Sequence, residues 1–173
     1  MNSDLEFAFT IGTIDGIITA LMIASRAILS DTAMSLDLSV RIALGSSVVG
    51  ASSYLVAEYG KLRAEDSLVY RHLRPQGSRR LRNEVNIELF VDAFRGGSIS
   101  MLMGFVGAAI PLISYSLFER IQVISIGISY LTLILMGVIL GRKSGGKILL
   151  WSTSLVILGL LMTLLGYYVR VIS

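Results

Sequence analysis

The chain has 173 residues, of which 54% are hydrophobic and 16% are charged, and its mean hydropathy is +0.74. Because a soluble domain carries about 25% charged residues, this composition excludes an ordinary water-soluble globule. The net charge is +3 and Cys is absent, which excludes a disulfide scaffold, a thiolate zinc site and a cysteine nucleophile. A basic excess on so apolar a chain fits nucleic-acid or lipid-headgroup binding, or loops on the cytoplasmic side of a membrane.

Five apolar stretches are long enough to cross a bilayer as helices, which needs roughly 20 mostly apolar residues. They are residues 7–29, 40–59, 96–117, 121–140 and 148–169. Residues 60–95 contain the only sizeable polar stretch, which we expect to be a helical cytoplasmic connection. The sequence therefore predicts an all-α membrane protein of five transmembrane helices, with residues 1–173 forming a single transmembrane domain.

The basic residues predict the orientation. Ten of the 15 Lys and Arg residues lie between the second and third spans or between the fourth and fifth: Lys61, Arg63, Arg71, Arg74, Arg79, Arg80, Arg82, Arg142, Lys143 and Lys147. The positive-inside rule places these connections and the N-terminus in the cytoplasm, and an odd number of spans places the C-terminus outside. The chain starts with acidic residues and shows no cleavage site, so we expect no cleavable signal peptide. With no organelle signal, we expect a multi-pass protein of a prokaryotic plasma membrane.

Asp15 is the ionisable residue deepest inside a predicted span. It follows Phe7 by eight residues, about 12 Å along a helix, and no Lys or Arg is close to it in sequence. At about 100° per residue, Thr19, Met22 and Arg26 lie on the same helical face. Because intramembrane charges are costly and mark functional sites by default, we interpret Asp15 as a cation or proton site. The alternative is a carboxylate that caps or hydrogen-bonds another helix.

Glu58 is the second candidate, at the cytoplasmic end of the second span, with Ser47 and Tyr54 on its face. A carboxylate that reaches water from the membrane interface explains Glu58 as well as a functional role does. Three further acidic residues of the connection face the same side of the membrane and form a candidate acidic entrance: Glu65, Glu84 and Glu88. For Glu84 and Glu88, a solvated helix face is the leading interpretation.

The sequence contains no phosphate-binding loop, no HExxH motif and no nucleophile–base pair, so we expect neither an enzyme nor a permanently bound cofactor. The basic connection has no aromatic interleaving beyond Tyr70 and no nucleic-acid motif. We therefore expect lipid headgroups of the bilayer, and not nucleic acid, to be its neighbours.

Three pieces in order resemble the vacuolar iron transporter family, whose members are five-span divalent-metal transporters. Residues 11–17 (IGTIDGI) match the Gly-x-x-Asp-Gly opening of the family's first span. Residues 45–55 (GSSVVGASSYL) are similar to its second span, which is rich in small residues and ends in a Tyr. Residues 104–112 (GFVGAAIPL), followed by 141–146 (GRKSGG), resemble its later spans. Together these pieces cover nearly the whole chain.

The resemblance implies export of Fe²⁺ or Mn²⁺ from the cytosol, coupled to inward proton flow, by a homodimer whose first span lines the route. Asp15 would be the core metal ligand, because a carboxylate attracts a divalent cation and can exchange it for a proton. Met22 would add a softer ligand that helps to prefer Fe²⁺ over Mg²⁺, and Glu58 completes the candidate metal residues. Five residues are expected to line the pathway: Gly12, Gly16, Thr19, Ser47 and Tyr54.

The chain departs from the family pattern at three places. Val49 stands where members often carry Met, and Arg41 stands where an acid often begins the second span. The Glu-rich cytoplasmic insert of the plant and parasite members is absent, and the corresponding connection is short and net basic. The sequence thus resembles a short form of the family.

Two other functions remain open from the sequence. A non-transporting scaffold or assembly subunit would use Asp15 and Arg26 to pair with another subunit. A transporter of a different small solute would use Arg26 and Arg41 at the outer mouth to favour an anion or an organic solute.

Overall fold

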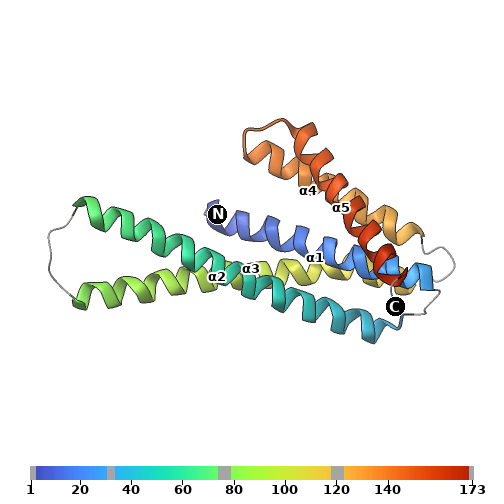
Figure 1. Cartoon of the computed structure of the whole chain (residues 1–173), viewed down its shortest axis with the longest axis horizontal. Coiled ribbons are helices and arrows are strands. Elements are labelled where there is room, and N and C mark those ends of the chain that lie inside the picture. Colours follow the sequence, from blue (N-terminus) through green and yellow to red (C-terminus); the bar gives the residue numbers. More distant parts are fainter. Residues whose placement is uncertain (1–2, 31–33, 74–78, 118–122, 172–173) are drawn as a thin grey trace.

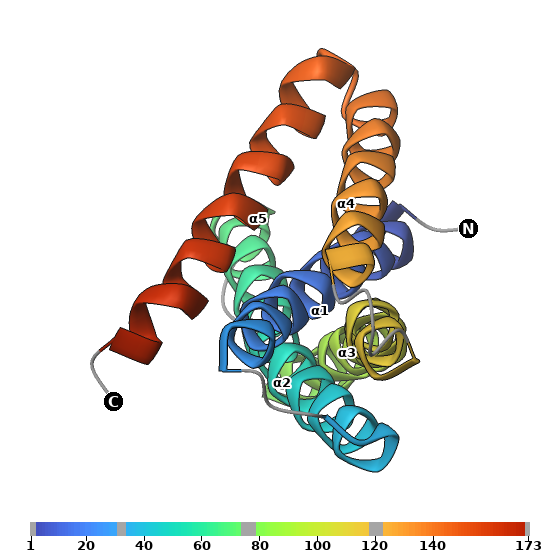
Figure 2. The same cartoon turned by 90° about the vertical axis from the view of Figure 1, so that its right-hand side faces the viewer.

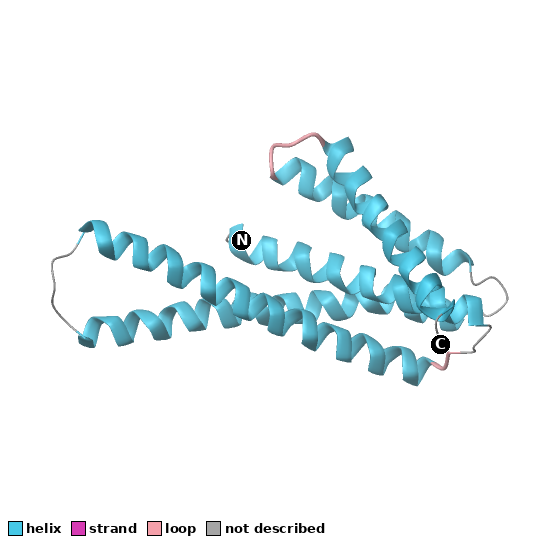
Figure 3. Ribbon diagram, viewed as in Figure 1, coloured by secondary structure: helices cyan, strands magenta, loops and turns pink. Residues whose placement is uncertain are grey.

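Five long helices make up most of the described chain (Figures 1 and 3). The computed structural model describes residues 3–30, 34–73, 79–117 and 123–171, with side chains described for 5–28, 34–66, 87–117 and 124–168. The helices are α1 (Ser3–Ser30), α2 (Leu36–Leu73), α3 (Arg79–Leu117), α4 (Val123–Lys143) and α5 (Ile148–Val171), and these ranges contain no strand. Each helix carries an apolar segment long enough to cross a membrane. The predicted all-α fold of five membrane-spanning helices is confirmed.

Helices α2 and α3 are longer than the spans that the sequence predicts. Their apolar segments, Leu36–Asp66 and Ile87–Leu117, each have 31 residues, or about 46 Å of helix against a hydrocarbon core of about 30 Å. The expected helical connection over residues 60–95 consists mainly of the continuations of these two helices. Figure 1 shows the α2–α3 pair reaching well beyond the N-terminus of α1.

Helix α1 lies at the centre of the bundle (Figure 2). On one side, Ile17 and Leu21 pack with Leu133 of α4 and Leu155 of α5 in one apolar cluster. A second cluster joins Ala20 of α1 to α2 and α3 through Ala43, Ala108 and Leu112. More than half of the apolar segment of α1 is buried inside the protein, against about a tenth of that of α5. The helix that carries Asp15 is therefore the one that the others enclose.

Small residues let α1 and α3 approach at backbone distance. A Cβ added to Gly16 would meet the carbonyl oxygen of Gly104 and would lie 2.8 Å from the amide nitrogen of Ala108. A Cβ on Gly12 would collide with the carbonyl oxygen of Ser100 in the same way. Because lipid provides no hydrophobic force that drives helices together, such close van der Waals contact is the main source of their association.

Helices α4 and α5 form a hairpin that leans against α1. The turn between them is tight, since Gly145 adopts a φ of 63°, a conformation that residues with a Cβ rarely take. One end of the hairpin is tied to α1 by an ion pair between Lys143 Nζ and Glu6 Oε2 at 2.7 Å. Elsewhere the Ser125 hydroxyl donates to the carbonyl oxygen of Pro111 in α3 at 2.8 Å. These contacts fix the hairpin on the side of α1 that faces away from α2.

Candidate functional site

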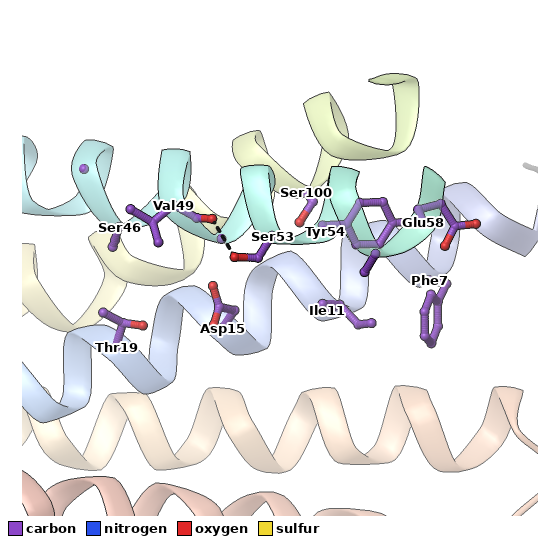
Figure 4. Close-up of a pocket in the computed structure, with 13 residues that line it drawn as sticks. Phe7, Ile11, Asp15, Thr19, Ser46, Val49, Ser53, Tyr54, Glu58 and Ser100 are labelled. Carbon is purple, nitrogen blue, oxygen red and sulfur yellow. Dashed lines mark hydrogen bonds between the residues drawn. The ribbon is translucent and has the colours of Figure 1, made fainter. Parts of the chain in front are cut away.

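The main cavity lies between α1 and α2 and has a volume of about 560 Å³ (Figure 4). Ser100 of α3 contributes to its wall. Its other lining residues come from successive turns of the first two helices: Phe7, Ile11, Asp15, Thr19, Gly45, Ser46, Val49, Gly50, Ser53, Tyr54, Ala57 and Glu58. The cavity therefore runs along the α1–α2 contact from the level of Thr19 to that of Glu58.

Asp15 lies about halfway through the membrane-spanning part of α1. It comes ten residues after Leu5, where the 24-residue apolar segment Leu5–Ile28 begins, so it is about 15 Å into a core about 30 Å thick. Its side chain points toward α2 (Figure 4) and is exposed in the single chain. Its Oδ2 atom occupies the space that a Cβ on Gly50 would need. The missing side chain at Gly50 thus makes room for the carboxylate.

Two serine hydroxyls in the cavity wall have their protons directed into α2. Ser46 Oγ donates to the carbonyl oxygen of Ala43 at 3.0 Å, and Ser53 Oγ donates to that of Val49 at 3.1 Å. A hydroxyl that donates its one proton to the backbone keeps its lone pairs for another partner. Both oxygens can therefore act as acceptors toward the cavity.

Glu58 and Tyr54 stand at the end of the cavity nearer the N-terminus of α1. Glu58 is buried, and its Oε1 atom lies 3.3 Å from Lys61 Nζ. The Tyr54 ring is also buried and lies over Gly96 of α3, where an added Cβ would be 2.8 Å from the ring. Both residues also line a smaller cavity of about 140 Å³, whose wall includes Asp92 and Arg95 of α3. Glu58 thus connects the main cavity to the region where α2 and α3 leave the bundle.

Every polar side chain that lines the main cavity presents oxygen. The set comprises the carboxylates of Asp15 and Glu58 and the hydroxyls of Thr19, Ser46, Ser53, Tyr54 and Ser100. Met22, a sequence-predicted metal ligand, is not part of this wall: it is half-buried, and its backbone carbonyl lies 2.5 Å from the position of a Cβ on Gly166 of α5. Met22 therefore does not line the cavity that holds Asp15.

Three of the residues expected to line the pathway lie in helix contacts. Gly12 and Gly16 face the backbone of α3, and Ser47 is buried with its Cβ 3.5 Å from the position of a Cβ on Gly104. Thr19 and Tyr54 do line the cavity. In the candidate acidic entrance, Glu65 and Glu88 are exposed on the extensions of α2 and α3. The Glu84 side chain lies outside the described residues.

The sequence did not single out Ser46, Gly50, Ser53 or Ser100 as site residues, yet all four line the cavity. The first three lie on one face of α2, because residues 46, 50 and 53 follow the helical spacing of three and four. This face is one residue, or about 100°, away from the face of Ser47. Their helical spacing could be read from the sequence. It did not identify the face that lines the cavity, because several faces of α2 carry small residues.

The side chains described in the structure contain no group of three or more His, Cys, Asp and Glu residues placed to hold a metal ion. Along the cavity, one chain therefore offers a divalent cation the Asp15 carboxylate with hydroxyl oxygens, and the Glu58 carboxylate at one end. Comparison of the chain with protein-family models, with curated proteins and with solved structures gives no match.

Proposed function

We propose that the protein is a transporter that moves a divalent cation, Fe²⁺ or Mn²⁺, out of the cytosol in exchange for protons. The observation that carries the proposal is the Asp15 carboxylate, which lies in mid-membrane in a cavity whose polar side chains all carry oxygen. Intramembrane carboxylates that face a cavity are typical of ion pathways and proton relays. The resemblance of residues 11–17 to the vacuolar iron transporters points to the same activity.

The charge and orientation of the cavity groups favour a cation over an anion. The lining includes no Lys or Arg, and the Ser46 and Ser53 protons are directed to backbone carbonyls. An anion would meet a carboxylate and oxygen lone pairs, whereas a cation would meet a full negative charge and several acceptors. Oxygen ligands suit hard cations such as Mn²⁺, and Fe²⁺ is compatible with the same set.

A single carboxylate also explains how the cation could be exchanged for protons. Asp15 attracts a metal ion when ionised and becomes neutral when protonated, so a metal ion and protons compete for the same oxygens. Proton entry from the outside would release the metal. It would also neutralise Asp15, which lowers the free-energy cost of an empty site in the membrane. The proposed orientation, with the N-terminus in the cytoplasm, rests on the basic residues in the α2–α3 connection and in the α4–α5 turn.

We further propose that two chains assemble with their α1–α2 faces together. Asp15 is exposed in the single chain at a depth where lipid would otherwise surround it, and an uncovered charge there is unfavourable. The exposed surface of α2 beside the cavity includes Gly45, Ser53 and Ala57, which are small residues of the kind that pack between transmembrane helices. The exposed surface of α5, in contrast, is rich in leucine.

Crosslinking tests this arrangement, because the chain has no Cys of its own. We expect Ser53→Cys to give a dimer-sized product with a short bismaleimide in proteoliposomes, since Ser53 lies on the proposed interface. Leu161→Cys is the matched control, because Leu161 is 52% exposed on α5. Crosslinking of Leu161→Cys without that of Ser53→Cys would place the contact between chains on α5 and contradict the proposed face.

Ion flux into proteoliposomes tests the transport proposal. With Mn²⁺ outside at neutral pH and an acidic lumen, we expect protein-dependent entry of radioactive Mn²⁺, together with a rise in lumenal pH. Fe²⁺ kept reduced should compete with Mn²⁺. Flux of phosphate or small carboxylates in place of Mn²⁺ would indicate a different solute. The absence of any flux above that of protein-free vesicles would favour a scaffold protein.

A further inference from the structure

A second cavity lies on the opposite side of the N-terminal end of α1, between α1 and the α4–α5 hairpin. It has a volume of about 390 Å³ and is lined by Glu6, Phe7, Thr10, Leu140, Lys143, Ser144 and Trp151. This space is far larger than the roughly 30 Å³ of a single water molecule. None of the proposed transport steps uses it.

The position of this cavity matches the level of lipid headgroups. Its lining residues come from the points where three apolar segments begin or end: Leu5 begins that of α1, Lys143 ends that of α4 and Ile148 begins that of α5. The Trp151 indole nitrogen lies 2.8 Å from the position of a Cβ on Gly146, so the ring folds back over the turn. Tryptophan is enriched at this depth of a bilayer.

The cavity is apolar inside, and the α4–α5 turn beside it is positively charged. Phe7, Leu140 and Trp151 provide the apolar wall, while the turn carries the exposed side chains of Arg142, Lys143 and Lys147. Glu6 neutralises Lys143 through the ion pair at 2.7 Å. Among the side chains described, no carboxylate forms an ion pair with Arg142 or Lys147, and both residues lie on the turn beside the cavity and not in its wall.

We propose that this cavity binds one anionic phospholipid, with its phosphate at the α4–α5 turn and an acyl chain against Phe7, Leu140 and Trp151. Basic pockets between transmembrane helices bind anionic headgroups in this way. The apolar wall needs a hydrocarbon neighbour and the basic turn beside it attracts a negative charge, and an anionic phospholipid supplies both in one molecule. A soluble anion would leave the apolar wall uncovered. The proposal does not depend on the transported solute.

Lipid retention tests the proposal. The full-length protein is equilibrated in mixed micelles with equal amounts of phosphatidylglycerol and phosphatidylcholine, and the retained lipid is counted by native mass spectrometry. We expect the wild type to retain phosphatidylglycerol preferentially. The double variant Arg142→Gln/Lys147→Gln, which keeps the Glu6–Lys143 pair, should lose this preference by about fivefold for each cation removed.

Three comparisons separate a specific site from a general charge effect. The variant Arg41→Gln/Arg63→Gln removes two exposed cations that lie away from this cavity, and it should retain phosphatidylglycerol like the wild type. Leu140→Trp, which fills the apolar part, should reduce retention of the lipid without changing the charge. Soluble glycerol phosphate should not displace the lipid. Equal retention by the wild type and the Arg142/Lys147 variant, equal loss in the Arg41/Arg63 control, or displacement by glycerol phosphate would each overturn the proposal.

Discussion

Replacing Asp15 by asparagine is expected to abolish Mn²⁺ flux driven by a pH gradient. Asparagine has nearly the same shape but carries no charge, so the cavity would keep its volume and lose its one mid-membrane anion. Two opposite unit charges about 4 Å apart attract each other by about 4 kcal/mol at an effective dielectric constant of about 20, so we expect a loss of at least about a hundredfold in the affinity of the site for a divalent cation. Radioactive Mn²⁺ uptake and calorimetric Mn²⁺ binding measure this loss.

Protein stability distinguishes a functional role of Asp15 from a structural one. Because the substitution removes a charge from the membrane, we expect Asp15→Asn to keep or raise the Tm in detergent. Asp37→Asn is the matched control, since Asp37 is exposed at the start of α2, away from the cavity, and pairs with Arg41 at 2.9 Å. Its flux should equal that of the wild type. If Asp15→Asn transports as well as the wild type, the proposed mechanism is wrong.

Gly50→Ala is expected to reduce Mn²⁺ flux by about tenfold to a hundredfold, although it adds one methyl group. The new Cβ would occupy the position of the Asp15 Oδ2 atom, so the carboxylate would have to rotate away from α2. Displacing a reactive group by about 1 Å can reduce a rate by about a hundredfold. Because the Asp15 side chain is exposed and can move, we expect little change in the Tm.

The chain contains a close control for Gly50→Ala. Gly60 lies on the same helix but outside the cavity, and no atom lies within 4 Å of the position of its added Cβ. Gly60→Ala should therefore transport at the wild-type rate. Equal losses in the two variants would attribute the effect to a Gly-to-Ala change in α2 as such and would remove the assigned role of Gly50 in positioning Asp15.

The fold could be predicted from the sequence because hydropathy reports directly on membrane-spanning helices. The helix ends were less predictable: α2 continues past Tyr59 to Leu73, and α3 begins at Arg79, because a helix can leave the membrane without any break in its backbone. Hydropathy marks the boundary of the lipid, whereas the helix ends where its backbone hydrogen bonds end. Residues 60–73 and 79–95 are richer in charged residues than the predicted spans, but they continue the same helices.

The site was only partly predictable because the sequence does not fix how each helix is rotated. Asp15 and Thr19 could be placed together on one face of α1, since their spacing of four leaves little choice. On α2 the choice was open, because Ser46, Ser47 and Gly50 give small residues to adjacent faces. The packing of α2 against α3 determines which face of α2 lines the cavity. Ser47 packs against Gly104, which leaves Ser46 and Gly50 on the side of Asp15.

The central position of α1 has a consequence for how the protein enters the membrane. α1 is the first of the five helices in the chain, yet its neighbours in the bundle, α2, α3, α4 and α5, are all synthesised after it. During synthesis, Asp15 is therefore held in the insertion machinery or in lipid before the other helices are made. An aspartate at the centre of a helix adds about 2.5–3.5 kcal/mol to the free energy of membrane insertion. Arrival of α2 lowers this penalty only in part, because Asp15 stays exposed in the single chain, and pairing of two chains would cover it. The residue proposed to move ions thus also raises the cost of holding the first helix in the membrane before its neighbours are made.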